Sequence, residues 1–128
     1  MKHVKDMVAE ANKTVTCLTP EQAIDLHGND GVLFVDLRDV RELQRQGLVP
    51  GAFHCPRGML EFWIDPESPY AKEEFQSARQ YVFYCASGWR SALSARTAQD
   101  MGLEGVSHIV SGFGGWKEAG GAIEQKPR

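Results

Sequence analysis

The sequence predicts an α/β domain built on a mostly parallel sheet, and three observations carry this prediction. Short apolar runs alternate with helical patterns along the whole chain. Two of these runs, VLFVD at Val32–Asp36 and YVFY at 81–84, have the continuous apolar character of strands that are covered on both faces. The strongest helical pattern, 91–101, follows the second run and stops at Gly102. We therefore expect 32–36 and 81–84 to be adjacent central strands, with a helix beginning near Arg90.

The remaining elements follow from local signals in chain order. Residues 2–12 are expected to form an amphipathic helix, and 14–18 a short strand. The TPEQ sequence at 19–22 is a capping box with proline at the first helical position, so a helix should run from there toward His27. Further helical segments are expected at 39–46 (ending at Gly47), 58–64, 71–78 and 115–120, and short strands within 50–56 and at 107–110.

Length and charge limit the function classes. With 128 residues the chain has the size of one domain, and its net charge of -3 and scattered basic residues argue against a nucleic-acid partner. No apolar run is long enough to span a membrane, because the best candidate, GVLFVDL, is interrupted at Asp36. The first fifteen residues are too charged for a signal peptide. We expect a cytoplasmic protein with no membrane partner.

The spacing of the three cysteines does not indicate a disulfide framework. Cys17, Cys55 and Cys85 are widely spaced, and no C-x-x-C pair occurs. The four histidines are also far apart, so neither a metal site nor a cofactor is predicted. His54 is adjacent to Cys55, but neighbouring strand residues point to opposite faces and would not form a dyad. Cys17 and Cys55 are interpreted as core residues.

Cys85 stands where a predicted buried strand meets a helix, in the segment CASGWRS at 85–91. In open α/β sheets, ligand sites gather at the carboxyl ends of strands. A short loop there directs several backbone N–H groups toward one point, and the helix dipole adds positive potential. Gly88 suits a sharp bend around a ligand. Cys85 is thus predicted to be a nucleophilic thiolate at a partly exposed site; the other interpretation is a buried cysteine that ends a strand.

Five segments resemble the rhodanese family, in the family's order. CASGWRS resembles its active-site loop, C-x-x-G-x-R-S. VLFVDLRDVREL resembles a strand that ends in D-x-R, followed by an acidic residue able to pair with the arginine, and GLVPGAFHCP resembles the next segment, G-H-I-P-G-A. TPEQA is similar to the first helix and SGFGGWKEAGG to the last segment. The resemblance covers 15–123, leaving an amino-terminal helical extension, 1–14, and a tail, 124–128.

The resemblance implies a fold and a reaction. The fold is a five-stranded, mainly parallel sheet with helices on both faces and the nucleophilic cysteine after the fourth strand. The Cys85 thiolate would take the outer sulfur of a donor such as thiosulfate or a persulfide, and the resulting persulfide would pass it to cyanide or a thiol, which is a small molecule or a protein. The implied binding segment is Ala86, Ser87, Gly88, Trp89, Arg90 and Ser91, whose loop N–H groups would stabilise the transferring charge.

Two loop positions differ from the usual pattern of thiosulfate-using relatives. Ala86 occupies a position that often carries a basic residue, and Trp89 is bulky where small or polar residues are common. Both differences bear on thiosulfate, because its double charge is most easily bound beside cations. Arg57, in HCPRGMLEFW, is a candidate cation from a neighbouring loop; it is equally well interpreted as a solvated surface residue.

Three further charged residues are assigned roles. Arg90 either faces the bound anion or is structural at the start of its helix. A cation at a helix amino terminus opposes the dipole, which favours a specific partner for it. Asp36 and Arg38 are interpreted as structural support for the loop after the second strand.

Two other functions use the same fold. A phosphatase or arsenate reductase needs a C-x-x-x-x-x-R loop to enclose a tetrahedral oxyanion, but only four residues separate Cys85 from Arg90. A noncatalytic rhodanese-like binding module typically lacks the cysteine, which is present here. The shorter loop suits a single sulfur atom, so sulfur transfer is the predicted activity.

Overall fold

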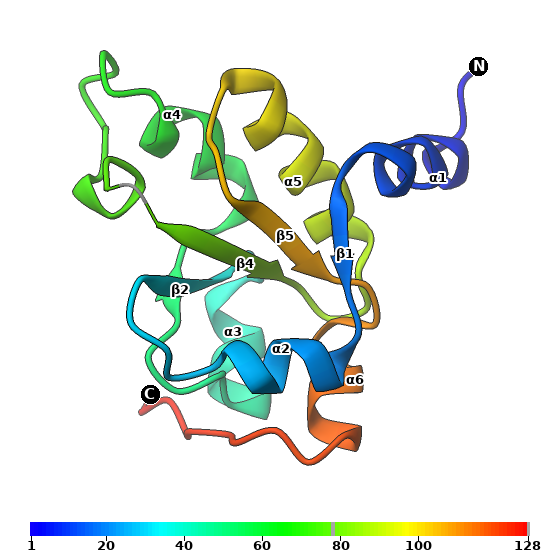
Figure 1. Cartoon of the computed structure of the whole chain (residues 1–128), viewed down its shortest axis with the longest axis vertical. Helices are drawn as coiled ribbons and strands as arrows, with labels where there is room; N and C mark the ends of the chain where they lie inside the picture. Colours follow the sequence, from blue (N-terminus) through cyan, green and yellow to red (C-terminus); the bar gives the residue numbers. More distant parts are fainter. Residues whose placement is uncertain (78, 128) are drawn as a thin grey trace.

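The computed structural model describes residues 1–77 and 79–127, and within them five parallel strands form one sheet (Figure 1). The strands are β1 (Thr16–Leu18), β2 (Val32–Asp36), β3 (Phe53–His54), β4 (Gln80–Tyr84) and β5 (Val106–Ile109), in the order β1-β5-β4-β2-β3. β2 and β4 pair in register from Val32 opposite Gln80 to Asp36 opposite Tyr84. The predicted α/β class and the predicted central strand pair are therefore confirmed.

Helices cover both faces of the sheet, as Figure 1 shows. On one face α4 (Leu60–Ile64) and α5 (Trp89–Met101) enclose a cluster with Val35, Tyr81 and Phe83. On the other, α2 (Pro20–Leu26) and α6 (Gly112–Glu118) enclose a second cluster with Phe34 and Val82. The remaining helical elements are α1 (Val4–Thr14), which packs on α5, α3 (Val40–Gln46), and the short 3-10 turns η1 (Arg57–Met59) and η2 (Glu73–Phe75).

The predicted helix signals act as expected. Thr19 and Gln22 form the capping box at the start of α2, with the Gln22 N–H donating to Thr19 Oγ1 at 3.1 Å and the Thr19 N–H to Gln22 Oε1 at 2.9 Å. Gly102 ends α5 in the left-handed region, with φ of 101°. No helix in the described residues, 1–77 and 79–127, has the length and apolarity needed to cross a bilayer.

The helix predicted over 71–78 is wrong. Only η2 forms there, and residue 78 lies outside the described residues. Phe75 is inserted into the core beside Tyr81, and the Tyr81 hydroxyl donates to the carbonyls of Glu74 at 3.0 Å and Ser77 at 2.7 Å. These contacts with β4 hold the described part of the segment in a non-helical conformation. An isolated helix this short is only weakly stable, so the tertiary contacts decide the conformation.

Candidate active site

Cys85 directly follows β4, and α5 begins four residues later at Trp89. Between them Gly88 adopts a φ of 101°, which is unfavourable for any residue that has a Cβ atom. A Cβ atom at this position would also lie 2.0 Å from the Val110 carbonyl oxygen, which is an overlap with backbone. Gly88 is therefore required both by the bend of the loop and by its contact with the segment after β5.

The start of α6 holds the other side of the Cys85 loop. The Phe113 N–H donates to the Cys85 carbonyl at 2.8 Å, and the Gly114 N–H donates to the Ala86 carbonyl at 3.2 Å. Gly112 has φ of 67°, and a Cβ there would lie 2.5 Å from the Ala86 oxygen. The glycine-rich segment after β5 thus fixes the loop by close backbone approach.

The Cys85 sulfur accepts hydrogen bonds from two backbone N–H groups of its own loop. Its Sγ accepts the Gly88 N–H at 3.2 Å and the Ser91 N–H at 3.3 Å. Within residues 1–77 and 79–127, the N–H groups of Ser87, Trp89 and Arg90 donate to no protein acceptor. Such an arrangement stabilises negative charge on the sulfur and on an atom attached to it. Cys85 is only 1% exposed, so the expectation of a partly exposed residue is wrong: the loop wraps around the sulfur.

A buried hydrogen-bond chain leads away from the sulfur. The Ser91 hydroxyl lies 3.6 Å from Cys85 Sγ and 2.9 Å from His108 Nδ1, and His108 Nε2 lies 2.8 Å from Asn12 Oδ1. Burial lowers the pKa of His108 to about 4, so the ring is neutral at physiological pH. Neither His108 nor Asn12 is among the residues predicted from the sequence, where the signal is a histidine inside the apolar strand SHIV.

Arg90 forms a bidentate ion pair with Glu42 of α3. Its Nη1 and Nη2 donate to Glu42 Oε2 and Oε1, each at 2.9 Å. Hydrogen bonding to Glu42 raises the pKa of Arg90, and Cys85 makes a smaller contribution in the same direction. Arg90 thus has the specific partner expected of a cation at a helix start, and it lies beside the loop already paired with Glu42.

The Arg90–Glu42 pair predicts a pH dependence of stability. The hydrogen bond from Arg90 lowers the pKa of Glu42 in the folded protein. The pair therefore stabilises the fold fully above the unfolded carboxyl pKa of about 4.3, and this stabilisation is lost as pH falls through the lower folded value. In Glu42→Gln, which keeps an N3 side chain able to cap α3, denaturant unfolding should show less loss of stability between pH 6 and pH 3. An identical pH profile in both proteins would contradict the ion pair's role.

Asp36 and Arg38 form a fully buried ion pair behind the loop. Arg38 Nη2 donates to Asp36 Oδ2 at 2.7 Å and to the Gly47 carbonyl at 2.8 Å, and its guanidinium lies 4.3 Å from the centre of the Phe113 ring. The arginine's partner is thus Asp36 itself. The acidic residue that follows, Asp39, instead pairs with Arg41, which corrects the expected pairing. Both residues connect β2 to the end of α3 and the start of α6, consistent with structural support.

Arg57 and Trp89 occupy the surface. Arg57 Nη1 donates to Glu61 at 3.0 Å, and the side chain lines a cavity of about 290 Å³ between α1 and α5. Among the described residues, the Arg57 guanidinium forms no hydrogen bond or ion pair with Cys85 or its loop. The Trp89 side chain is 49% exposed at the first position of α5, beside the loop. Arg57 is therefore paired with Glu61, and the Trp89 side chain is half exposed at the start of α5.

The other two cysteines differ from Cys85 and from each other. Cys55 is fully buried in the core as predicted, and burial raises the pKa of its thiol to about 12. Cys17, predicted to be a core residue, is exposed. It lies on the edge strand β1, where its Sγ is 3.6 Å from the Asn12 carbonyl and 3.7 Å from both the Val15 carbonyl and His108 Nε2. Neither thiol has backbone N–H donors in the described structure.

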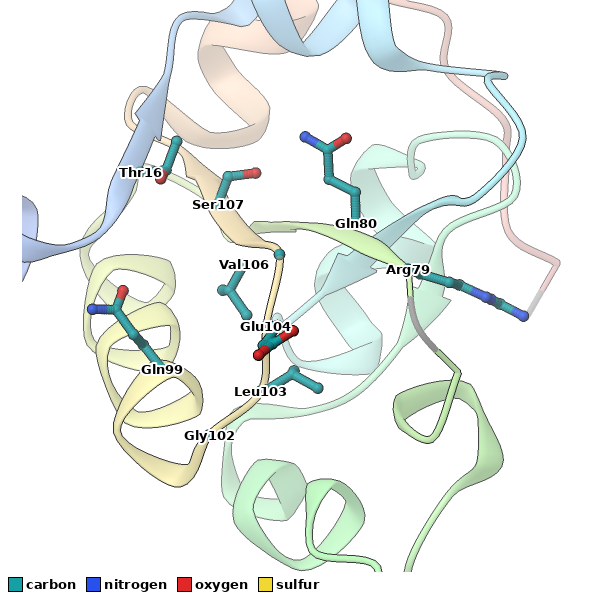
Figure 2. A pocket seen from close by; sticks show the side chains of 10 residues that line it. Thr16, Arg79, Gln80, Gln99, Gly102, Leu103, Glu104, Val106 and Ser107 are labelled. Atoms are coloured by element: carbon teal, nitrogen blue, oxygen red, sulfur yellow. The ribbon is translucent and has the colours of Figure 1, made fainter.

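A cavity of about 730 Å³ lies at the amino ends of the strands, whereas Cys85 lies at their carboxyl ends. Its lining includes Thr16, Gln80 and Val106, which begin β1, β4 and β5 (Figure 2). Cys85 follows the carboxyl end of β4, so this cavity is separate from the candidate active site. Among the described residues that line it, Arg79 and Glu104 are the charged ones, and no cysteine or histidine is present.

The fold and the loop together define an α/β protein with a candidate nucleophilic cysteine that accepts backbone N–H groups of its loop. The family model described as "Rhodanese-like domain" matches residues 19–119. The chain therefore belongs to the rhodanese-like family, and the predicted family resemblance is confirmed. The match begins after α1 and β1 and leaves Asn12 outside it.

Several known proteins are similar to this chain. Thiosulfate sulfurtransferase GlpE from Glaesserella parasuis is 27% identical over 104 residues, which are 81% of this chain and 88% of that protein. A thiosulfate sulfurtransferase structure from Pseudomonas aeruginosa shares the fold, with a TM-score of 0.78, 21% identity, and coverage of 97% of this chain and 23% of that one. A Rhodopseudomonas palustris structure, described as a "Protein of Unknown Function" and "Possible Tyrosine Phosphatase", is 57% identical with a TM-score of 0.95, covering 97% and 96%.

Proposed function

We propose that the protein is a sulfurtransferase that carries a sulfane sulfur as a persulfide on Cys85. The observation that supports this most strongly is the position of Cys85 Sγ, which accepts two backbone N–H groups at 3.2 and 3.3 Å in a loop with further N–H groups free. Donors to the inner sulfur stabilise the thiolate before the reaction, and free donors nearby stabilise charge on a second sulfur attached to it.

The reaction consists of two displacements at sulfur. In the first, the Cys85 thiolate attacks the outer sulfur of a donor R–S–SH or of thiosulfate; the new S–S bond forms as the old one breaks, and RSH or sulfite leaves with the electron pair. In the second, an acceptor thiolate or cyanide attacks the outer sulfur of the Cys85 persulfide. The acceptor becomes a persulfide or thiocyanate, and the Cys85 thiolate is restored.

The loop favours a singly charged donor. Ala86 brings no cation, and both candidate arginines are paired, Arg90 with Glu42 and Arg57 with Glu61. Neutral N–H groups stabilise one negative charge well, but a dianion such as thiosulfate gains more from an unpaired cation. We therefore propose that a persulfide of a small thiol or of a protein is a better sulfur donor than thiosulfate.

Mass spectrometry of the intact and digested protein tests this proposal. After incubation with thiosulfate or with the persulfide of a small thiol, the protein should gain one sulfur atom on the peptide that contains Cys85. Dithiothreitol should remove it, and the persulfide donor should load the protein faster. Sulfur on Cys17 or Cys55 in place of Cys85, or no addition from either donor, would contradict the proposal.

A phosphatase is the second candidate, because the 57% identical structure is described as a "Possible Tyrosine Phosphatase". Against it, only four residues separate Cys85 from Arg90, and the Arg90 guanidinium is already paired with Glu42. A loop of this length has fewer N–H groups to surround the three oxygens of a phosphoryl group. Purified protein should show no hydrolysis of an aryl phosphate; turnover that disappears in Cys85→Ser would make the protein a phosphatase.

A further inference from the structure

The buried chain from Cys85 through Ser91 and His108 ends on a helix outside the matched family region. α1 packs on α5 through Val8 and Ala11 against Ala92, so Asn12 is held against His108 of β5 (Figure 1). At the same ring nitrogen that faces Asn12, the exposed Cys17 places its Sγ 3.7 Å from His108 Nε2, and this sulfur also lies 3.5 Å from Asn12 Oδ1. The chain thus joins a sulfur that is 1% exposed to a side chain at the protein surface.

Among the described residues, the side chains that meet the His108 ring nitrogens are uncharged. They are Asn12 from α1, Cys17 from β1 and Ser91 from α5, and the neighbouring residue on β4 is Phe83. The burial that lowers the pKa of His108 to about 4 keeps the ring neutral, and burial also raises the pKa of the Cys17 thiol, which stays protonated. A neutral imidazole carries one proton, on either Nε2 or Nδ1, and accepts a hydrogen bond at the other nitrogen.

With the proton on Nε2, the ring donates to Asn12 Oδ1, and Nδ1 accepts the Ser91 hydroxyl. The Ser91 lone pairs then face Cys85, so Ser91 Oγ accepts the Cys85 S–H. This arrangement suits the thiol and would repel a thiolate or persulfide anion.

With the proton on Nδ1, the ring donates to Ser91 Oγ, and the Ser91 hydroxyl is free to donate to the Cys85 sulfur. Nε2 is then the hydrogen-bond acceptor, and either the Asn12 amide N–H or the Cys17 S–H can donate to it. Asn12 suits both states because an amide carries both an acceptor and a donor.

We propose that Ser91, His108 and Asn12 form a proton relay that carries the Cys85 proton to solvent and turns the Ser91 hydroxyl into a donor to the resulting anion. The Cys85 proton passes to Ser91 Oγ, the Ser91 proton passes to His108 Nδ1, and the Nε2 proton leaves to a buffer base at the Cys17 edge. No bond between heavy atoms changes, and the net result is a Cys85 thiolate, a neutral ring and one proton in solution. In this scheme Ser91 and His108 carry the proton, Asn12 is a positioning residue that hydrogen-bonds to Nε2, and α1 completes the site. The relay's use in turnover rests on the proposed function.

Nitrogen NMR of the ¹⁵N-histidine-labelled protein tests the relay directly. The protein has four histidines, and the His108 signals are assigned by their loss in His108→Gln. In the reduced protein the protonated nitrogen should be Nε2, and on conversion of Cys85 to its persulfide it should become Nδ1. A persulfide confirmed by mass spectrometry with no change at His108 would overturn the relay.

If no donor forms the persulfide, the sulfurtransferase proposal fails while the relay remains testable. The reduced protein is then titrated upward in pH, with the rate of Cys85 alkylation by iodoacetamide reporting thiolate formation. The His108 proton should move from Nε2 to Nδ1 over the same pH interval. Thiolate formation that leaves the His108 signals unchanged would overturn the relay independently of sulfur transfer.

Substitutions supply a second test. Ser91→Ala removes one hydrogen bond to the anion and should slow Cys85 alkylation at fixed pH by about tenfold to a hundredfold. Asn12→Leu should slow alkylation and abolish the tautomer change, whereas Lys13→Leu, at the adjacent exposed position of α1, should behave as the wild type. Thermal unfolding of each variant controls for loss of fold. Equal alkylation rates in folded Ser91→Ala, Asn12→Leu and the wild type would overturn the relay.

Discussion

Cys85→Ser should abolish both sulfur transfer and the persulfide adduct, while the free energy of unfolding changes by less than about 1 kcal/mol. A serine hydroxyl is not ionised near neutral pH and does not form a stable sulfur adduct, so the first displacement cannot occur. Stability should be nearly kept, because the smaller hydroxyl can accept the Gly88 and Ser91 N–H groups that now donate to Sγ. Thiosulfate:cyanide and persulfide:thiol assays, mass spectrometry and denaturant unfolding provide the three measurements.

Cys55→Ser is the matched control for this prediction. Cys55 is fully buried in the core formed by β2, β4, α4 and α5, and burial raises the pKa of its thiol to about 12. Placing a hydroxyl there should cost about 1–3 kcal/mol of stability while activity and the adduct are kept. If the adduct survives in Cys85→Ser, or disappears in a folded Cys55→Ser, the nucleophile has been assigned to the wrong cysteine.

The parts of the fold that could be predicted depend on short-range signals. The two central strands are Val32–Asp36 and 81–84, and both have apolar side chains on the two faces of the sheet. This pattern is visible in the sequence alone, without knowledge of any tertiary contact. Thr19 caps α2 and Gly102 ends α5 through bonds to residues within one turn. The position of Cys85 between a central strand and a helix follows from the same local pattern.

What could not be predicted depends on contacts between distant segments. Arg90 meets Glu42 across 48 positions, and His108 meets Asn12 across 96, so no window of sequence contains either pair. Cys17 is exposed because β1 is an edge strand, and the strand order is a property of the whole sheet. Residues 71–77 form only the short turn η2, because Tyr81, which is outside them, hydrogen-bonds to the carbonyls of Glu74 and Ser77.

Gly88→Ala should reduce both stability and activity severely, in contrast to Gly102→Ala. The two glycines share a φ of 101°, so each substitution adds the strain of placing alanine in the left-handed region, about 1–2 kcal/mol. At Gly102 a Cβ would meet nothing within 4 Å, whereas at Gly88 it would lie 2.0 Å from the Val110 oxygen. The difference between the two variants therefore measures the overlap with Val110 alone.

Relief of this overlap must move either the Cys85 loop or the segment after β5. Either movement separates the Cys85 sulfur from the Gly88 N–H, now at 3.2 Å, and disturbs the neighbouring Ser91 N–H. Loss of one such donor to a developing anion typically costs about a hundredfold or more in rate. Gly88→Ala should therefore lose at least 2 kcal/mol more stability than Gly102→Ala, on the order of an unrelieved backbone overlap, and about a hundredfold in sulfur transfer, while Gly102→Ala keeps its activity. Equal unfolding free energies and equal transfer rates in the two variants would mean that the contact between Gly88 and Val110 does not shape the site.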